Sequence, residues 1–239
     1  MKGLDYTSFF KKGYGKIEKF VDPALLEPIR DELHRRMDLN NDMARINDHF
    51  AMVNQPWMTV PGVLELGLDD RILKIMTHSL GSSMGLGTCN LRHSFITPLK
   101  DTSTTMFHRD NNSKNFLKVF FYLNDVTDDA DGPFTYVEGS HILRKETGYT
   151  IGSRWPDDQI EELYGKTKII PLRANMGDLL IANTTGFHKG LQCSAATRGM
   201  LTLNYTTEAE KFGKFKITQA QLAELCTTKQ QYCKYLDIV

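Results

Sequence analysis

The spacing of hydrophobic residues changes from helical to strand-like about a third of the way along the chain. The first predicted helix begins at Asp22, which can cap it, with Pro23 at its first position. Its apolar stripe consists of Leu25, Leu26, Ile29 and Leu33. A second helix is predicted over 70–80, and Gly81 ends it. From Gly87 onward, strands are predicted near residues 88–96, 104–109, 116–123, 134–138, 167–172, 178–182 and 198–206.

These segments predict a mainly β fold with flanking helices. Short strands in this number are typical of a double-stranded β-helix, the jelly-roll or cupin-like barrel. We expect a single domain over 1–239, because 239 residues can bury one sizeable core. In this domain an N-terminal helical part (about 1–85) packs outside the barrel (about 86–207), and one or two short helices follow in a C-terminal extension (about 208–239).

The candidate chemistry lies in His108-Arg109-Asp110 and in the more distant His188. Side chains two apart on a strand point the same way, so His108 and Asp110 can approach one metal while Arg109 faces elsewhere. Two imidazoles and one carboxylate form the facial triad of non-haem Fe(II) oxygenases, which leaves other metal positions open. We therefore predict that His108, Asp110 and His188 are metal ligands and catalytic residues.

Arg198 begins the strand that returns after this second histidine. If strands 178–182 and 198–206 pair antiparallel, Arg198 is carried back towards His188. Its planar guanidinium can bind a carboxylate through two charge-assisted hydrogen bonds. The alternative is an ion pair with a surface carboxylate, which contributes little to stability. We favour a role for Arg198 in binding the co-substrate.

At these residues the chain resembles the phytanoyl-CoA dioxygenase family of Fe(II)- and 2-oxoglutarate-dependent oxygenases. The resemblance extends over roughly residues 6–205 and depends on several segments in the same order. These segments are Phe107-His108-Arg109-Asp110, the strand 116–123 with Asn124-Asp125-Val126, Gly132-Pro133, Gly139-Ser140-His141, Gly186-Phe187-His188-Lys189-Gly190 and Arg198. The ordered set is specific, whereas His-x-Asp alone is a weak signal.

The resemblance implies an enzyme that hydroxylates an unactivated C–H bond of a small-molecule or carrier-bound substrate. Fe(II) would be held by His108, Asp110 and His188, with O2 consumed and succinate and CO2 released. Arg198 would hold the far carboxylate of 2-oxoglutarate, and the family pattern places His141 in a structural turn. The chain departs from the family at Glu138, where a proline is common, and at Gly190, where some members have a hydroxyl that contacts the co-substrate.

Other candidate binding residues lie on the strands and in the segment 142–166. Lys118 shares a strand face with Tyr122 and can meet an anionic substrate or co-substrate, or extend from the edge into solvent. The same alternatives apply to Arg92. The segment 142–166 is a candidate lid, because loops usually determine what such a scaffold binds. A solvated surface loop and a segment that binds an anionic or sugar-like ligand both remain open, and the cationic and aromatic residues in question are Arg144, Lys145, Tyr149, Arg154 and Trp155.

Composition favours a soluble enzyme acting on small-molecule, acyl or sugar-type substrates. The 29 basic residues balance the 29 acidic residues, which argues against a broad nucleic-acid-binding or membrane-binding surface. The first residues do not show the long apolar core and small-residue cleavage site typical of a secretory signal, and no 18-residue apolar run occurs in the sequence. Its four cysteines are widely scattered, as expected for free thiols in a reducing compartment. We therefore expect a cytoplasmic protein, and the sequence carries no signal for its oligomeric state.

Two other functional classes remain open at this point. A cupin-like metalloenzyme can use the same triad without 2-oxoglutarate. A non-catalytic barrel can retain a metal for stability or binding. Binding of 2-oxoglutarate separates the first from the oxygenase hypothesis, and turnover separates the second.

Overall fold

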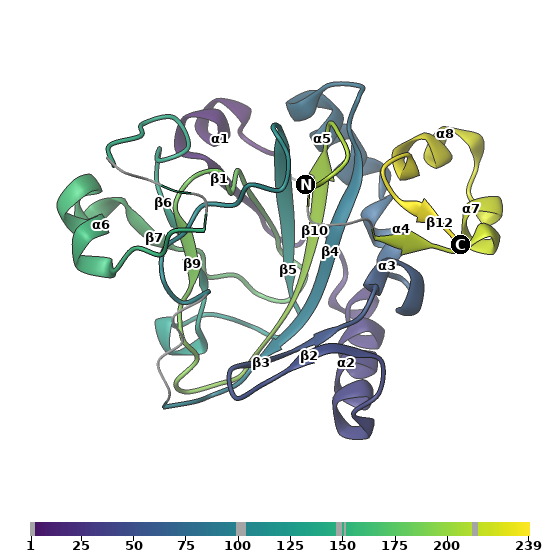
Figure 1. Ribbon diagram of the computed structural model, residues 1–239, viewed down its shortest axis with the longest axis horizontal. Helices are drawn as coiled ribbons and strands as arrows, with labels where there is room; N and C mark the ends of the chain where they lie inside the picture. The colour runs from purple at the N-terminus through teal and green to yellow at the C-terminus, as the bar shows by residue number, and fades with distance from the viewer. Residues whose placement is uncertain (1–2, 99–103, 147–149, 151, 212–214) are drawn as a thin grey trace.

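Two antiparallel sheets face each other in the molecule (Figure 1). The computed structural model describes residues 3–98, 104–146, 150, 152–211 and 215–239. The larger sheet has seven strands, in the order β1 (Tyr14–Ile17), β8 (Leu179–Ala182), β5 (Phe116–Tyr122), β10 (Arg198–Thr206), β4 (Gly85–Ser94), β3 (Phe50–Val53) and β2 (Met43–Ile46). The smaller sheet has three strands, in the order β7 (Ile169–Pro171), β6 (Phe134–Val137) and β9 (His188–Gly190).

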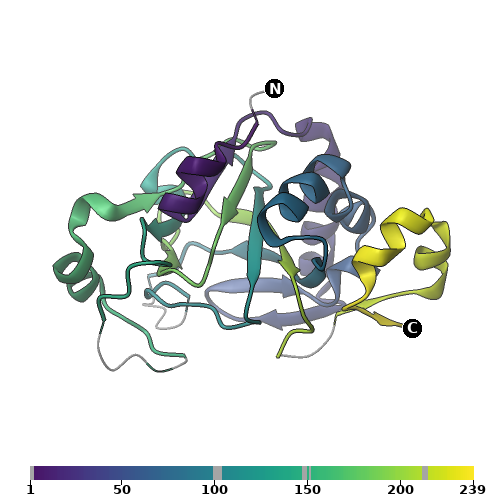
Figure 2. The same ribbon diagram turned by 90° about the horizontal axis from the view of Figure 1, so that it is seen from above.

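Helices lie outside the two sheets. They are α1 (Tyr6–Lys12), α2 (Glu27–Leu39), α3 (Pro56–Thr59), α4 (Val63–Gly67), α5 (Asp70–Leu80), α6 (Asp157–Tyr164), α7 (Gln219–Glu224) and α8 (Thr227–Gln230). Short 3-10 turns form η1 (Pro23–Leu25), η2 (Asp129–Asp131), η3 (Lys166–Lys168) and η4 (Gln231–Cys233), and a parallel pair joins β11 (Lys216–Ile217) to β12 (Asp237–Ile238). Figure 2 shows α6 and the C-terminal helices at opposite ends of the molecule. Among the described residues, no helix is both long and apolar enough to cross a membrane.

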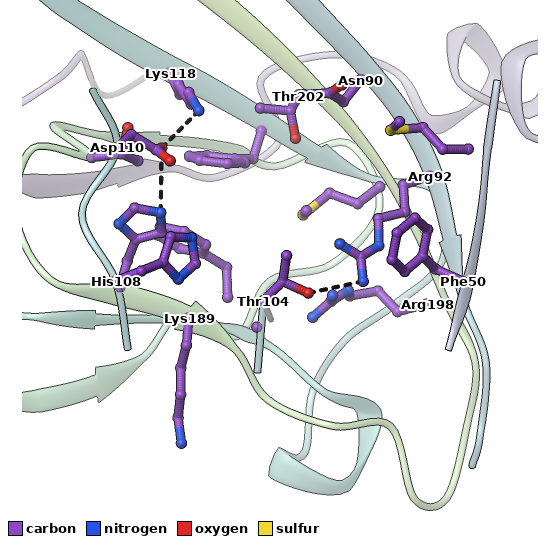
Figure 3. A pocket seen from close by; sticks show the side chains of 17 residues that line it. Phe50, Asn90, Arg92, Thr104, His108, Asp110, Lys118, Lys189, Arg198 and Thr202 are labelled. Atoms are coloured by element: carbon purple, nitrogen blue, oxygen red, sulfur yellow. Dashed lines mark hydrogen bonds and ion pairs between the residues drawn. The ribbon is translucent and has the colours of Figure 1, made fainter. Parts of the chain in front are cut away.

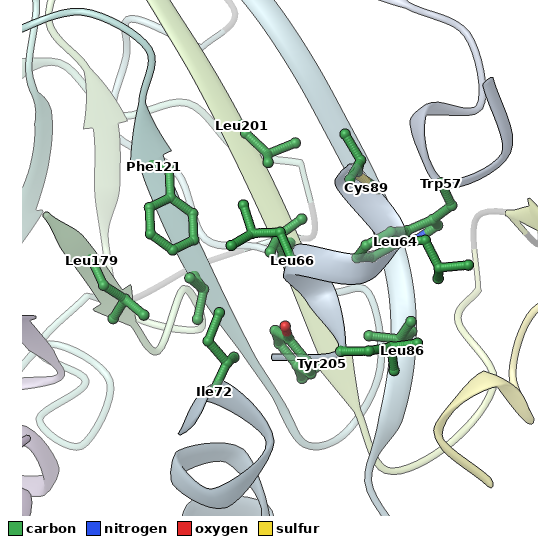
Figure 4. Packing of buried hydrophobic residues seen from close by; sticks show 14 of the residues in the cluster. Trp57, Leu64, Leu66, Ile72, Leu86, Cys89, Phe121, Leu179, Leu201 and Tyr205 are labelled. Carbon is green, nitrogen blue, oxygen red and sulfur yellow. The ribbon is translucent and has the colours of Figure 1, made fainter. Parts of the chain in front are cut away.

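The largest core lies between the outer face of the larger sheet and the helices. On β5, Leu117, Val119 and Phe121 point to this side, because successive side chains of a strand alternate between faces. Figure 4 shows Phe121 and neighbouring strand residues packing against the helical side of the molecule. Each fully buried side chain of this size contributes roughly 1.5–3 kcal/mol through the hydrophobic effect. This core fixes the orientation of β5, and with it the residues on its other face.

The space between the two sheets holds a second, aromatic cluster. Phe120 and Tyr122, the alternate residues of β5, point into it. Phe120 stacks on Phe134 of β6 with 4.5 Å between ring centroids. A third cluster covers the outer face of the smaller sheet, where Ile160 and Tyr164 of α6 pack on Phe187. The mainly β fold with helices packed outside, expected from the alternation, is confirmed.

Three expectations about the elements need correction. The segment before residue 86 is not only helical, since β1, β2 and β3 belong to the larger sheet. These strands have four residues each, and their conformation depends on pairing, of β1 with β8, of β3 with β4 and of β2 with β3, rather than on local alternation. The segment 104–109 forms only isolated bridges at Phe107 and His108, because Thr104 and Thr105 lie in a turn. Finally, β5 lies between β8 and β10, so the condition that 178–182 pairs directly with 198–206 is not met.

The two predicted helices are present, with one difference in the first stripe. The second helix spans the predicted residues and ends at Gly81, which adopts a φ of 86°. The first begins with η1 capped by Asp22 and continues as α2. Leu26, Ile29 and Leu33 are buried, but Leu25 is 61% exposed. The 3-10 turn rotates Leu25 away from the side on which the continuing helix packs.

The adjacent residues Leu25 and Leu26 provide a matched test of this packing. Leu26→Ala should lower the free energy of unfolding by about 2–5 kcal/mol, because it leaves a cavity in the core. Leu25→Ala should change it by less than about 0.5 kcal/mol, as is usual for an exposed position. Urea unfolding followed by circular dichroism measures both, and equal losses would contradict the assigned burial.

Candidate metal and co-substrate site

Backbone pairing brings together the segments that carry His108, Asp110 and His188. The amide of His108 donates to the His188 carbonyl, and the amide of His188 donates to the His108 carbonyl, both at 3.0 Å. The amide of Asp110 donates to Thr184 O at 2.9 Å. Residues 107–108 thus extend the smaller sheet along β9. This pairing fixes the relative positions of three side chains that lie far apart in the chain.

The three side chains converge at one end of a cavity between the sheets (Figure 3). One potential ligand atom from each of His108, Asp110 and His188 lies within 4.8 Å of the others. His188 Nε2 is 3.3 Å from Asp110 Oδ2, and the two imidazole centroids are 4.4 Å apart. This is the only such group of His, Cys, Asp and Glu side chains found within the described ranges. The spacing allows all three to contact a single ion.

Both imidazoles are oriented by carbonyl groups of their own segments. His108 Nδ1 lies 2.9 Å from Met106 O, and His188 Nδ1 lies 2.9 Å from Gly186 O. Since a carbonyl only accepts, each Nδ1 carries the proton and each Nε2 presents a lone pair. Burial and the neighbouring His188 lower the pKa of His108 to about 3, so this imidazole is neutral at pH 7. Neutral imidazole is the form that binds a metal.

Asp110 is held as a carboxylate by Lys118. Lys118 lies on the inner face of β5, and its Nζ donates to Asp110 Oδ2 at a distance of 2.7 Å. Burial alone would raise the pKa of Asp110, but the neighbouring Lys118 holds it well below its ordinary value. The carboxylate is therefore ionised and available to a cation. The structure places Lys118 in the cavity beside the candidate metal ligands.

Arg198 lies at the other end of the cavity, where β10 begins. It is 3% exposed, and its Nη2 donates to Ser94 Oγ at 3.2 Å. Its Nε and Nη1 are buried without a hydrogen-bond partner among the residues described. Leaving such donors unpaired is costly, and a carboxylate matches their planar geometry. A Cβ at Gly190 would stand 3.1 Å from Nη2, so the glycine leaves room for the guanidinium.

Arg92 reaches the same end of the cavity from β4. Its Nη2 donates to Thr104 Oγ1 at 3.1 Å, and its guanidinium carbon lies 3.8 Å from the centroid of Phe50. Figure 3 shows the guanidinium groups of Arg92 and Arg198 side by side. The cavity measures about 320 Å³. With one cationic end and one end carrying two imidazoles and a carboxylate, it can hold a small anion that also contacts a metal ion.

Three predicted substrate residues do not line this cavity. Tyr122 is 1% exposed, and its hydroxyl donates to Leu172 O at 2.9 Å and accepts from the Phe134 amide at 2.8 Å. It is a core residue, because its position on β5 places the side chain in the aromatic cluster, beyond the residues that line the cavity. Trp155 pairs with Phe107 through the backbone and packs edge-on against Phe187, on the outer side of the smaller sheet. Arg154 is exposed, with its guanidinium bonded to Gly152 O.

The candidate lid is partly described. Tyr149 lies outside the described residues. The part near Glu146 is attached to the outer face of the smaller sheet through Arg109 and Tyr164. His141 is not among the grouped ligands, and its Nε2 lies 3.0 Å from Phe10 O.

Sequence reasoning missed several residues that line the cavity. Phe50 and Met52 belong to β3, which the spacing did not predict. Asn90 and Thr202 face the cavity from β4 and β10, where they form a directly opposed pair. Asn90 could have been identified from the sequence, since it is two residues from Arg92 and therefore on the same face of the strand. On this strand, the polar residues Asn90 and Arg92 share the face that lines the cavity.

Solved structures with similar folds include enzymes crystallised with metal and 2-oxoglutarate. HygX from Streptomyces hygroscopicus, with nickel, 2-oxoglutarate and hygromycin B bound, has a TM-score of 0.64 and 17% identity, covering 89% of each chain. The epimerase SnoN, in complex with Fe3+, alpha ketoglutarate and nogalamycin RO, has a TM-score of 0.66 and 18% identity, covering 84% of this chain and 81% of SnoN. The carbocyclase SnoK from nogalamycin biosynthesis has a TM-score of 0.61 and 16% identity, covering 83% and 81%.

These similarities place the fold among the jelly-roll structures of such enzymes. No curated protein sequence matches the chain. The family described as phytanoyl-CoA dioxygenase (PhyH) matches residues 9–200, most of the chain. The chain therefore belongs to the phytanoyl-CoA dioxygenase family.

Proposed function

We propose that this protein is an Fe(II)- and 2-oxoglutarate-dependent oxygenase in which Arg198 anchors the co-substrate. The observation that carries the proposal is the cavity with the triad at one end and a buried arginine with unpaired donors at the other. Family membership and the metal- and 2-oxoglutarate-bound neighbours support the same reaction class. A dicarboxylate can span such a cavity, with one end at the metal and the other at the guanidinium.

Each residue has a distinct part in this proposal. His108, Asp110 and His188 hold Fe(II), with the carbonyl-oriented Nε2 atoms and the ionised carboxylate as donors. Bound Fe(II) and 2-oxoglutarate supply an oxidant from O2, with release of succinate and CO2. Lys118 orients the Asp110 carboxylate through its short hydrogen bond. Arg198 binds the far carboxylate, and Arg92 adds a second positive charge beside it.

We further propose that the reaction is hydroxylation of an unactivated C–H bond. By its resemblance to this family, the chain keeps in Asp110 the carboxylate that related halogenases lose to make room for chloride, which favours hydroxylation over halogenation. The structural neighbours include an epimerase and a carbocyclase, so the outcome depends on how the substrate is oriented. A cavity of about 320 Å³ suits a small molecule or the terminal part of a larger, carrier-bound one. Asn90, Thr202 and Met200 are wall residues that can contact it.

The co-substrate site can be tested by anaerobic titration of metal-free protein with Fe(II) and then 2-oxoglutarate. The weak visible charge-transfer band of the chelate should appear only when both are present. Arg198→Ala should weaken 2-oxoglutarate binding by at least roughly tenfold, because a buried charge-assisted pair is lost. Arg173→Ala is the control, since Arg173 forms an exposed pair with Asp129.

Wild-type binding of Fe(II) without any 2-oxoglutarate band would instead favour a metalloenzyme that uses no oxo-acid. An unchanged affinity in Arg198→Ala would remove this arginine from the co-substrate site. Oxygen consumption with a panel of small substrates then distinguishes an enzyme from a metal-binding barrel.

The metal site can be tested with two histidine variants. His188→Ala should abolish tight Fe(II) binding, because it removes one of three donors. His141→Ala should leave the Fe(II) dissociation constant unchanged, because His141 contacts Phe10 O outside the triad. Competition with a fluorescent metal chelator under anaerobic conditions measures both constants. Equal effects of the two substitutions would contradict the assignment of ligands.

A further inference from the structure

We infer that Arg109 is a positioning residue that fastens the segment carrying His108 and Asp110 to the segment carrying His188. The inference rests on the proposed function, because those three side chains are its metal ligands. Arg109 stands between two of them but faces the opposite side of the smaller sheet. There it is 5% exposed, although no metal or co-substrate group lies on that side in the proposal.

Arg109 is in direct contact with the His188 segment. Pairing of His108 with His188 places Arg109 opposite Phe187, and its guanidinium carbon lies 4.1 Å from the Phe187 ring centroid. Arg109 Nη1 donates to Thr185 O at 2.6 Å. One side chain thus contacts the residue before the third ligand and the carbonyl three positions before it. The chain between Thr185 and His188 has little freedom to move relative to Asp110.

Ser140 links Arg109 to the His188 segment. Arg109 Nη1 also donates to Ser140 O at 2.8 Å. The Ser140 hydroxyl accepts from the Phe187 amide at 2.8 Å, and Ser140 is completely buried. Ser140, the middle residue of the Gly-Ser-His turn, therefore supports the metal site. It connects the outer-facing arginine to the backbone that leads into His188.

Glu146 compensates the buried charge of Arg109. Its Oε1 lies 2.8 Å from Arg109 Nη2, and both side chains are 2% exposed. The Tyr164 hydroxyl lies 2.8 Å from Glu146 Oε2 and 3.2 Å from Arg109 Nη2. A buried ion pair of this kind is a poor source of net stability, but its geometry is well defined. We therefore assign this ion pair to positioning the ligand segments, behind which it lies.

The consequence is that the separation of the ligands depends on a group that touches neither metal nor co-substrate. Partners that orient metal ligands typically contribute 10–100-fold to metal affinity. We expect an effect within this range from Arg109, which acts through the backbone of the two segments. A purely structural ion pair would affect unfolding without affecting metal binding. These two readouts separate the alternatives.

The test uses the double variant Arg109→Met/Glu146→Gln, which removes the interaction without leaving a buried unpaired carboxylate. We expect its Fe(II) dissociation constant to rise by about 10–100-fold under anaerobic conditions. Arg36→Met is the matched control, because Arg36 is a buried arginine bound to Glu32 and Asp42 on the distant helix α2 side. It should lower the unfolding midpoint while leaving Fe(II) affinity unchanged. Arg109→Lys should not rescue affinity, since one ammonium cannot reproduce the planar contacts.

A second readout needs no metal and separates this inference from the proposed function. Hydrogen exchange at the amides of His108 and His188 should accelerate in the metal-free double variant and not in Arg36→Met, relative to core amides of β5. Unchanged exchange and unchanged Fe(II) affinity in a folded double variant would overturn the positioning role. If the wild type bound no Fe(II), the proposed function would fail, while the exchange rates would still decide whether Arg109 holds the two segments together.

Discussion

Two backbone hydrogen bonds between His108 and His188 join the ends of segments that are distant in the chain. The pairing turns both imidazoles to the inner side of the smaller sheet, and the bond from the Asp110 amide to Thr184 O holds the carboxylate next to them. The carbonyls of Met106 and Gly186 then set the imidazole tautomers. The backbone pairing therefore sets the relative positions of the candidate ligands, and few side-chain torsions remain to be fixed by other contacts.

The larger sheet contributes the electrostatic part of the site. Its inner face presents Lys118 next to Asp110 and presents Arg198 and Arg92 at the other end of the cavity. Burying these cations is unfavourable unless anions meet them. Asp110 meets Lys118 within the protein, whereas the unpaired donors of Arg198 favour an anion from outside. The outer face of the same sheet packs on helices, so the core holds these charged groups in place.

The local spacing of hydrophobic residues was sufficient to predict the elements whose two faces differ in polarity. Strand β5 alternates between Leu117 or Val119 on one side and Lys118 on the other, and α5 has clear end signals. It was insufficient for β3, whose four residues depend on pairing with β4, and for Leu25, which the 3-10 turn exposes. Tyr122 lies in the aromatic cluster rather than along the cavity, because alternation gives the face of a residue but not its depth between the sheets.

The sequence by itself determined the family and the identity of the candidate donors, since residue type and order carry both the His-x-Asp pair and the later histidine and arginine. Only the tertiary structure decided that Arg198 reaches the cavity from a strand next to β5 rather than next to β8, and that Arg109 faces Phe187. The physical reason is that alternation is encoded locally, every two residues, whereas the partner of a strand depends on non-local pairing that the spacing along one segment does not contain.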